Sequence, residues 1–220
     1  MIGVSSSSSY IPGLKSVQEL ERLAVSYIQG VQGDDELSEI ARSGFDDAIA
    51  DINSRTWKKL LGSQDITTVV GRASWGLNRD FKDPFHVELL DSSGNPNGRL
   101  HHKEWKALLR DHPRADANDC PTYYTIDYAR RELVTQFALA QEFVNEHTWM
   151  RLHYYQRFVL GGARPPEFDW YMIWKARAAL ASIRAREKVG FAESRAERKF
   201  RELKIDDNRT AQDWSDNYYA

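Results

Sequence analysis

The sequence predicts an α+β fold, namely a mainly α-helical bundle of about four helices with a central inserted antiparallel β-region. Three observations predict this fold. Apolar residues recur at helical spacing near both ends of the chain, β-branched and alternating residues fill the middle, and no βαβ alternation joins them. With 220 residues, the chain is long enough for one sizeable domain or two small ones.

The N-terminal part predicts an arm followed by two helices. Residues 1–13 are rich in serine and end in Pro-Gly, so we expect a flexible arm there. Ser16 and Glu19 form a capping box, which predicts the start of the first helix. A second, longer helix follows with a continuous apolar face, and Gly62 closes it. We therefore expect helices across residues 14–62.

The middle of the chain, residues 64–160, predicts the antiparallel β-region. Residues 66–70 are β-branched throughout, and residues 85–89 alternate apolar with polar side chains, as half-buried strands do. Turn-forming residues at 91–98 predict a hairpin tip that projects from this region or is a plain solvent turn. A short helix and further strands are expected at 101–110, 123–128, 133–137 and 150–158.

Two more helices are expected across residues 166–204. Pro165-Pro166 ends the last strand, an aromatic-rich helix follows to about residue 188, and a charged helix covers 192–204. The polar tail at 206–220 lies beyond this predicted helix end and still keeps three aromatic residues, which a disordered tail cannot bury. The tail is therefore a candidate for docking onto a partner, or it folds back onto its own domain. Its aromatic residues are Trp214, Tyr218 and Tyr219.

Composition excludes several classes of protein. Thirty basic and thirty-two acidic residues give a formal charge of −2, which argues against a protein whose main task is gripping a nucleic-acid backbone. The single cysteine, Cys120, cannot form an internal disulfide. No apolar stretch approaches the ~20 residues that span a bilayer, and the N-terminus lacks the blocks of a signal peptide. We expect a protein made and kept in the cytoplasm, or in something assembled there.

A search for catalytic motifs predicts no active site, no metal and no cofactor. Gly-rich phosphate loops, nucleophile elbows and paired cysteine motifs do not occur. A zinc site is conceivable between residues 101 and 120, but the spacing matches no standard site. His147 and His153 are expected to be packed or interface residues, and the carboxylates of the second helix to be solvated. The residues weighed were His101, His102, His112, Asp116 and Cys120 for zinc, and Asp46, Asp47 and Asp51 for the carboxylates.

Four segments of the chain are similar to segments of a known protein family. The first is a long helix that ends in Ile52-Asn53 and Trp57 and leads directly into the β-region, and the last is a Pro-Glu motif that opens an aromatic-rich helix. In these segments and their order the chain resembles the head-to-tail adaptor (connector) proteins of tailed bacteriophages, including the tubular tail proteins of short-tailed phages. The resemblance covers most of residues 14–205. Its segments are residues 45–57, 81–90, 151–155 and 165–180.

The resemblance implies a structural virion protein without enzymatic activity. Such adaptors form a dodecameric ring below the portal, extend the DNA channel and provide the attachment site for the tail. The implied partners are the portal protein, tail or nozzle proteins and further copies of the chain; DNA passes through the lumen without sequence-specific binding, and no membrane is involved. The implied location is the virion neck, after assembly in the host cytoplasm.

The resemblance also implies where the contacts lie. A closed ring of identical subunits needs two different complementary faces on each subunit, and the third and fourth helices could supply them. We expect portal docking through the aromatic tail residues Trp214, Tyr218 and Tyr219. The residues expected at the ring interface are Trp170, Trp174, Arg195, Glu197 and Arg198.

Three alternatives stay open. The chain could be another neck protein, such as a stopper or a nozzle component. It could bind DNA during packaging through the arginines of its last two helices, although glutamates interleave with them and keep the net field small. It could also be a metal-dependent hydrolase that uses the region from His101 to Cys120.

Overall fold

The computed structural model describes residues 15–28, 35–111, 118–162 and 165–218, with side chains through residue 208 and excluding that of residue 109. It divides the chain into two compact units. The helical unit comprises Met1–Leu60 and Phe158–Ala220, and the β unit comprises Leu61–Arg157. The sequence had placed the β-region at residues 64–160, which is three residues later at each boundary.

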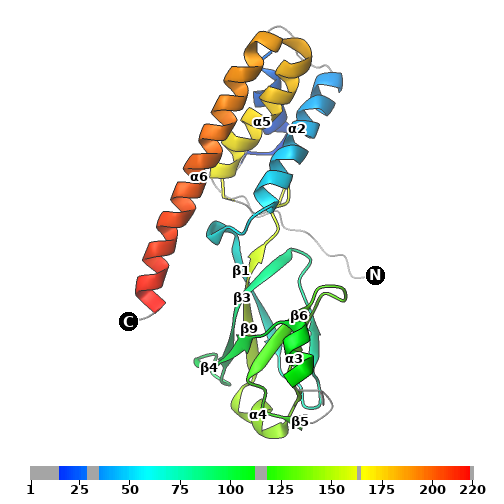
Figure 1. Ribbon diagram of the computed structural model, residues 1–220, viewed down its shortest axis with the longest axis vertical. Coiled ribbons are helices and arrows are strands. Elements are labelled where there is room, and N and C mark those ends of the chain that lie inside the picture. The colour runs from blue at the N-terminus through cyan, green and yellow to red at the C-terminus, as the bar shows by residue number, and fades with distance from the viewer. Residues whose placement is uncertain (1–14, 29–34, 112–117, 163–164, 219–220) are drawn as a thin grey trace. The chain divides into compact units, whose positions relative to one another are not determined.

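Three long helices make up most of the helical unit. α2, α5 and α6 lie side by side, and α1 packs against α2 and α5 (Figure 1). The predicted start of the first helix is confirmed, because Ser16 Oγ accepts a hydrogen bond from Glu19 N at 3.1 Å. The elements are α1 (Val17–Val25), α2 (Asp35–Asn53), η1 (Lys58–Leu60), α5 (Glu167–Arg184), η2 (Arg186–Lys188) and α6 (Val189–Tyr218).

The prediction that the second helix continues to Gly62 is wrong. α2 ends at Asn53, whose side chain donates to Phe158 O at 2.9 Å and accepts from Phe158 N at 2.8 Å. This pair of hydrogen bonds ties the helix end to a segment more than a hundred residues later. Trp57 and Leu60 are buried all the same, from a loop and a 3₁₀ turn that happen to continue the helical spacing. Gly62 lies in the first strand.

The last helix is longer than predicted. α6 continues to Tyr218 and its backbone passes the start of α5 (Figure 1), whereas the sequence indicated an end at residue 204. Asp207 explains part of this extension, because it is buried and accepts a hydrogen bond from Lys59 N at 3.1 Å. Lys59 Nζ also lies 3.8 Å from Asp206 Oδ2. These contacts hold the helix against η1 beyond residue 204.

The β unit consists of a curled seven-stranded sheet and smaller elements (Figure 1). Along the sheet the strands are β1 (Leu61–Thr67), β9 (Trp149–Gln156), β3 (Phe81–Leu90), β4 (Pro96–His102), β6 (Tyr123–Asp127), β7 (Glu132–Thr135) and β2 (Ser74–Gly76). A separate pair joins β5 (Asn118–Asp119) to β8 (Ala138–Leu139), and two short helices are α3 (Trp105–Asp111) and α4 (Gln141–Glu146).

The predicted fold class is therefore wrong in its proportions. The structure is 47% helical and 27% strand, with six α-helices and a large curled sheet rather than a four-helix bundle carrying a small β insert. The β-region is not purely antiparallel either, because β4 pairs with β6 and β5 with β8 in parallel. Strands as short as β2 and β8 carry too few residues for a period of two to show in the sequence.

The two edge strands of the curled sheet are joined through one side chain. Gln64 on β1 donates to Gly76 O on β2 at 2.9 Å and accepts from Asn78 N at 3.0 Å. Unpaired edge groups are open to pairing with other chains, so this amide satisfies groups that a regular ladder would leave exposed. The curl encloses an apolar core that includes Trp75, Leu133 and Leu152.

Candidate assembly surfaces

An acidic groove lies on the helical unit between α2, α5 and α6. Its volume is about 610 Å³. Four small residues leave room between the helices, while carboxylates from α2 and α6 surround it with a single lysine, Lys175, among them. The small residues are Ala178, Ala179, Ser182 and Ala196, and the carboxylates are Asp47, Asp51, Glu193 and Glu197. We call this set of residues, with Lys175, the acidic groove.

One carboxylate of the acidic groove is neutralised within the unit. Asp51 Oδ2 accepts a hydrogen bond from Tyr171 OH at 2.6 Å and lies 2.8 Å from Lys175 Nζ. Burial raises the pKa of Asp51, but the hydrogen bonds from Lys175 and Tyr171 outweigh it, so this pKa lies below its ordinary value. Since Lys175 compensates Asp51, the other three carboxylates leave the groove with a net negative charge at neutral pH.

A surface of opposite character is built from stacked rings and cations. Trp174 meets the rings of Tyr27 and Phe191 edge-on, with centroids 5.8 and 5.9 Å away. Arg177 lies 4.6 Å from the centroid of Trp174, and Arg195 lies 4.9 Å from that of Phe191. Cations are attracted to ring faces, so these pairs hold positive charge over aromatic rings, of which Phe191 is exposed and Trp174 is half-buried. With Lys188, which lies 5.6 Å from the centroid of Tyr27, these residues form what we call the basic aromatic surface.

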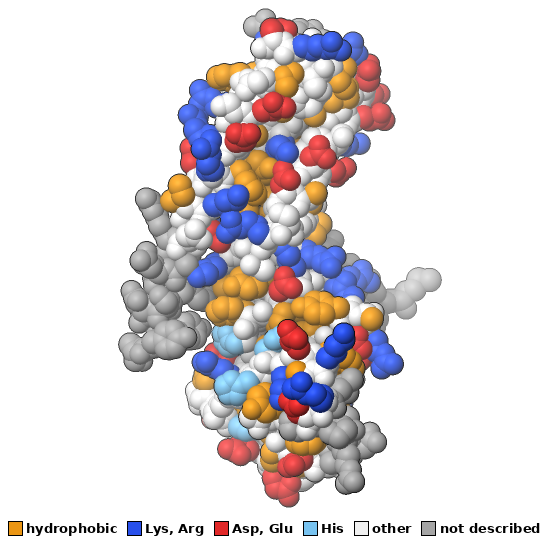
Figure 2. Space-filling model, viewed as in Figure 1, with side chains coloured by type: hydrophobic (Ala, Val, Ile, Leu, Met, Phe, Trp, Pro, Cys, Tyr) orange, Lys and Arg blue, Asp and Glu red, His pale blue; other side chains and the backbone are white. Residues whose placement is uncertain are grey.

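The two surfaces lie on different sides of α6. Phe191 and Glu193 are two residues apart, as are Arg195 and Glu197, which in a helix separates their side chains by about 200°. One long helix therefore presents positive and negative charge in nearly opposite directions. Figure 2 shows acidic and basic side chains interspersed on the visible face of the helical unit, with apolar side chains between them.

The five predicted ring-interface residues fall on both surfaces and beyond them. Trp174 and Arg195 belong to the basic aromatic surface, and Glu197 belongs to the acidic groove. Trp170 is 43% exposed on α5, with Lys15 Nζ 5.4 Å from its ring centroid. Arg198 is exposed and lies 3.7 Å from Glu202 one turn further along α6.

Two of the three residues predicted to dock onto the portal do not lie in a tail beyond the last helix. Trp214 and Tyr218 belong to the helical backbone of α6, not to a tail beyond the last helix. Their side chains, and all of Tyr219, lie outside the described part of the structure. Sequence reasoning missed Tyr27 and Phe191, which reach the basic aromatic surface from the end of α1 and the start of α6. The available signals were an aromatic residue on the apolar face of the first predicted helix, Tyr27, and another just before the predicted helix at 192–204, Phe191.

The histidines considered for zinc between residues 101 and 120 do not form a cluster among the described residues. His101 and His102 lie on β4 and are exposed, with their rings beside Tyr123 and Tyr124. Cys120 is exposed, and His112 and Asp116 lie outside the described residues.

On α2, Asp46 and Asp47 are exposed as expected, whereas Asp51 is held by Tyr171 and Lys175.

Neither known protein-family models nor curated proteins match this chain. Among the described residues, no helix has both the length and the apolar character needed to cross a membrane.

Proposed function

We propose that the chain is a structural, non-enzymatic protein of a tailed bacteriophage: a head-to-tail adaptor that forms a ring below the portal, extends the DNA channel and provides the attachment site for the tail. One observation carries the proposal, namely that the helical unit presents an acidic groove and a basic aromatic surface on different sides of α6. Along with the portal and tail proteins, further copies of the chain are then its partners.

A closed ring needs a heterologous interface, in which one face of a subunit meets a different face of its neighbour. The acidic groove and the basic aromatic surface supply such a pair. Arg195 and Lys188 of one copy are positively charged and are attracted by the carboxylates of the acidic groove in the neighbouring copy. Phe191 adds an apolar surface, because its side chain is 52% exposed. Small residues such as Ala178 and Ser182 allow a neighbouring helix to approach the groove closely.

The length of α6 supports portal docking by a helix. Because its backbone is helical through Tyr218, the proposed docking segment with Trp214 and Tyr218 forms the last turns of a long helix. The chain is nearly neutral, with a formal charge of −2, which fits a ring through which DNA passes without being tightly bound.

Charge reversal across the two surfaces tests the ring interface. Glu197→Lys and Arg195→Glu should each weaken chain-to-chain association by roughly tenfold or more, because like charges brought together cost several kcal/mol. Carrying both substitutions on one chain restores opposite charges across the interface, so association should recover. Native mass spectrometry of the chain, alone at raised concentration and mixed with portal rings, measures the number of associated copies.

The matched control is Glu142→Lys, an equal change of charge at an exposed position on α4 of the β unit. It should leave association unchanged. Single reversals that assemble like the unmodified chain, or a double reversal that is worse than either single one, would overturn the proposed pairing of the two surfaces.

A further inference from the structure

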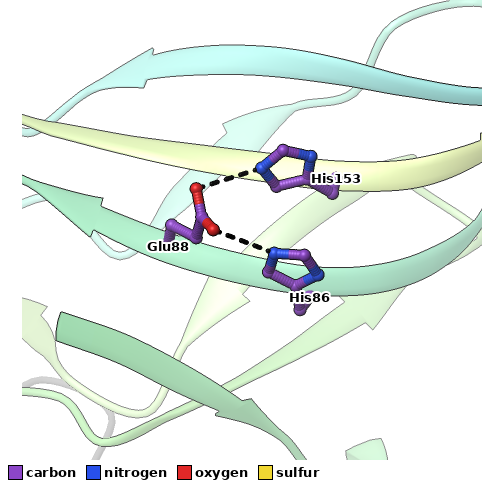
Figure 3. Close-up of side chains that lie close together, drawn as sticks. All are labelled: His86, Glu88 and His153. Atoms are coloured by element: carbon purple, nitrogen blue, oxygen red, sulfur yellow. Dashed lines mark hydrogen bonds and ion pairs between the residues drawn. The ribbon is translucent and has the colours of Figure 1, made fainter. Parts of the chain in front are cut away.

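Three side chains from two neighbouring strands converge on the outward face of the β unit (Figure 3). His86 and Glu88 lie on β3, and His153 lies on β9. The carboxylate of Glu88 lies beside the two rings and bridges them, with Oε1 3.3 Å from His86 Nε2 and Oε2 3.2 Å from His153 Nε2. The imidazole rings stack with centroids 4.4 Å apart and planes 20° from parallel. Figure 2 shows histidine side chains gathered on one face of this unit.

A β-bulge brings the two histidines opposite each other. Pro84 pairs with Tyr154 and His86 with His153, so Phe85 is an extra residue on β3. Without the bulge, Phe85 would lie opposite His153 and His86 would turn to the other face, because side chains alternate along a strand. Bulges occur next to functional sites, where they re-aim a side chain. The displaced Phe85 is 43% exposed and packs edge-on against His86.

The ligand atoms lie close enough for one metal ion to replace the hydrogen bonds between them. One nitrogen from each imidazole and one carboxylate oxygen all lie within 4.8 Å of one another. A tetrahedral zinc ion with bonds of about 2.1 Å places its ligand atoms about 3.4 Å apart, close to the observed nitrogen-to-oxygen distances. Binding requires at least one imidazole ring to turn out of the stack about its side-chain torsions, so that both in-plane Nε2 lone pairs point at the same ion.

The surroundings of the cluster keep these groups partly shielded. The side chains of His86, Glu88 and His153 retain 15%, 16% and 25% of their accessible surface, so a solvent position stays open beside them. Arg151, which pairs with Glu88 across the strands, is held by Asp65 in two hydrogen bonds of 2.7 and 3.1 Å. Its charge is therefore balanced by another carboxylate, and Glu88 remains directed at the two histidines.

We propose that His86, Glu88 and His153 bind a zinc ion, with water completing its coordination. Two imidazoles and one carboxylate form a ligand set that zinc uses in proteins with an open fourth position. The ion would fasten β3 to β9, two neighbouring strands inside the seven-stranded sheet, at the bulge. The sequence predicted no metal site, and this site is independent of the proposed adaptor function.

Isothermal titration of the full chain with Zn²⁺, after treatment with a chelator, tests the site. We expect one ion per chain with a dissociation constant in the micromolar range or below. His86→Gln and His153→Gln should each weaken binding at least about tenfold, because one of three protein ligands is lost. Glu88→Gln keeps the shape of the side chain and removes its charge, so it should weaken binding as well. Circular dichroism shows whether each variant is folded.

Controls separate this site from other zinc-binding groups. His101→Gln and Cys120→Ser change exposed residues outside the cluster and should leave the affinity unchanged. Co²⁺ bound in place of zinc should give visible absorption typical of nitrogen and oxygen ligands, without the near-ultraviolet band of a thiolate. Absence of stoichiometric binding to the unmodified chain, or loss of binding only in the His101 or Cys120 variant, would overturn the proposal.

Discussion

Replacing Trp57 with alanine should destabilise the helical unit by about 3–5 kcal/mol. Trp57 is 1% exposed, and its ring meets Phe168 and Phe200 edge-on at centroid distances of 5.1 and 5.7 Å. Its Nε1 also donates to Ile52 O at 2.7 Å. One side chain from the loop after α2 thus fills the space between α5 and α6, and alanine would leave a cavity there.

Hydrogen exchange resolved by segment measures this loss, because it reports the opening free energy of each helix separately from the β unit. In Trp57→Ala, protection should fall throughout α2, α5 and α6. Trp57→Phe keeps a ring and removes the hydrogen bond, so its effect should be intermediate. The control is Trp105→Ala on α3, where the side chain is 39% exposed and truncation should have little effect. Equal effects of the two alanine variants would contradict the assigned role of Trp57.

Replacing Gly44 with alanine should destabilise the contact between α2 and α5, although alanine favours helix formation. A Cβ on Gly44 would lie 2.5 Å from Ala176 Cα and 3.0 Å from Ala176 N. Both obstacles are backbone atoms of α5, so the helices must separate. Overpacking of this kind costs about 1–3 kcal/mol, and direct contact with backbone places Gly44 at the upper end. The gain in helix propensity, about 1 kcal/mol, recovers only part of it.

Gly190 provides a matched comparison on α6. A Cβ there meets nothing within 4 Å, so Gly190→Ala should be neutral or stabilising by up to about 1 kcal/mol. Chemical denaturation followed by far-ultraviolet circular dichroism compares the two variants. Opposite signs are expected, and a stabilising Gly44→Ala would show that α2 and α5 are not packed this closely. Because Asp47 and Asp51 follow Gly44 on α2 and surround the acidic groove, separation of the helices should also weaken ring assembly.

The sequence predicts local features of this protein better than its long-range ones. The capping box at Ser16 and the alternation along β3 depend on neighbouring residues, and both are visible in the sequence. The end of α2 depends on hydrogen bonds between Asn53 and Phe158, and the extension of α6 depends on Asp207 reaching Lys59. Such contacts between distant segments leave no local pattern, so the predicted helix ends were wrong.

For the candidate sites too, the sequence predicts local features better than contacts between distant segments. The sequence singled out Trp174, Arg195 and Glu197 because aromatic and charged residues stand out on the predicted last helices, and their role at a ring interface stays a prediction. Their division between two surfaces depends on the packing of α5 against α6. The histidine cluster could not be found, because strand register alone pairs His86 with His153. The irregularity at Phe85 also breaks the alternation, which had indicated that Phe85 faces the core.

The proposed adaptor function is tested most directly by native mass spectrometry of the unmodified chain mixed with the portal ring encoded alongside it. The proposal predicts saturable loading of about twelve copies, one for each portal subunit, because a ring that continues the portal shares its symmetry. Shortening α6 by residues 209–220, which spares the contacts of Asp206 and Asp207 with Lys59, should weaken this loading and leave the rest of the helical unit folded. A chain that never associates with the portal, or that forms only isologous dimers at every concentration, would contradict the proposal.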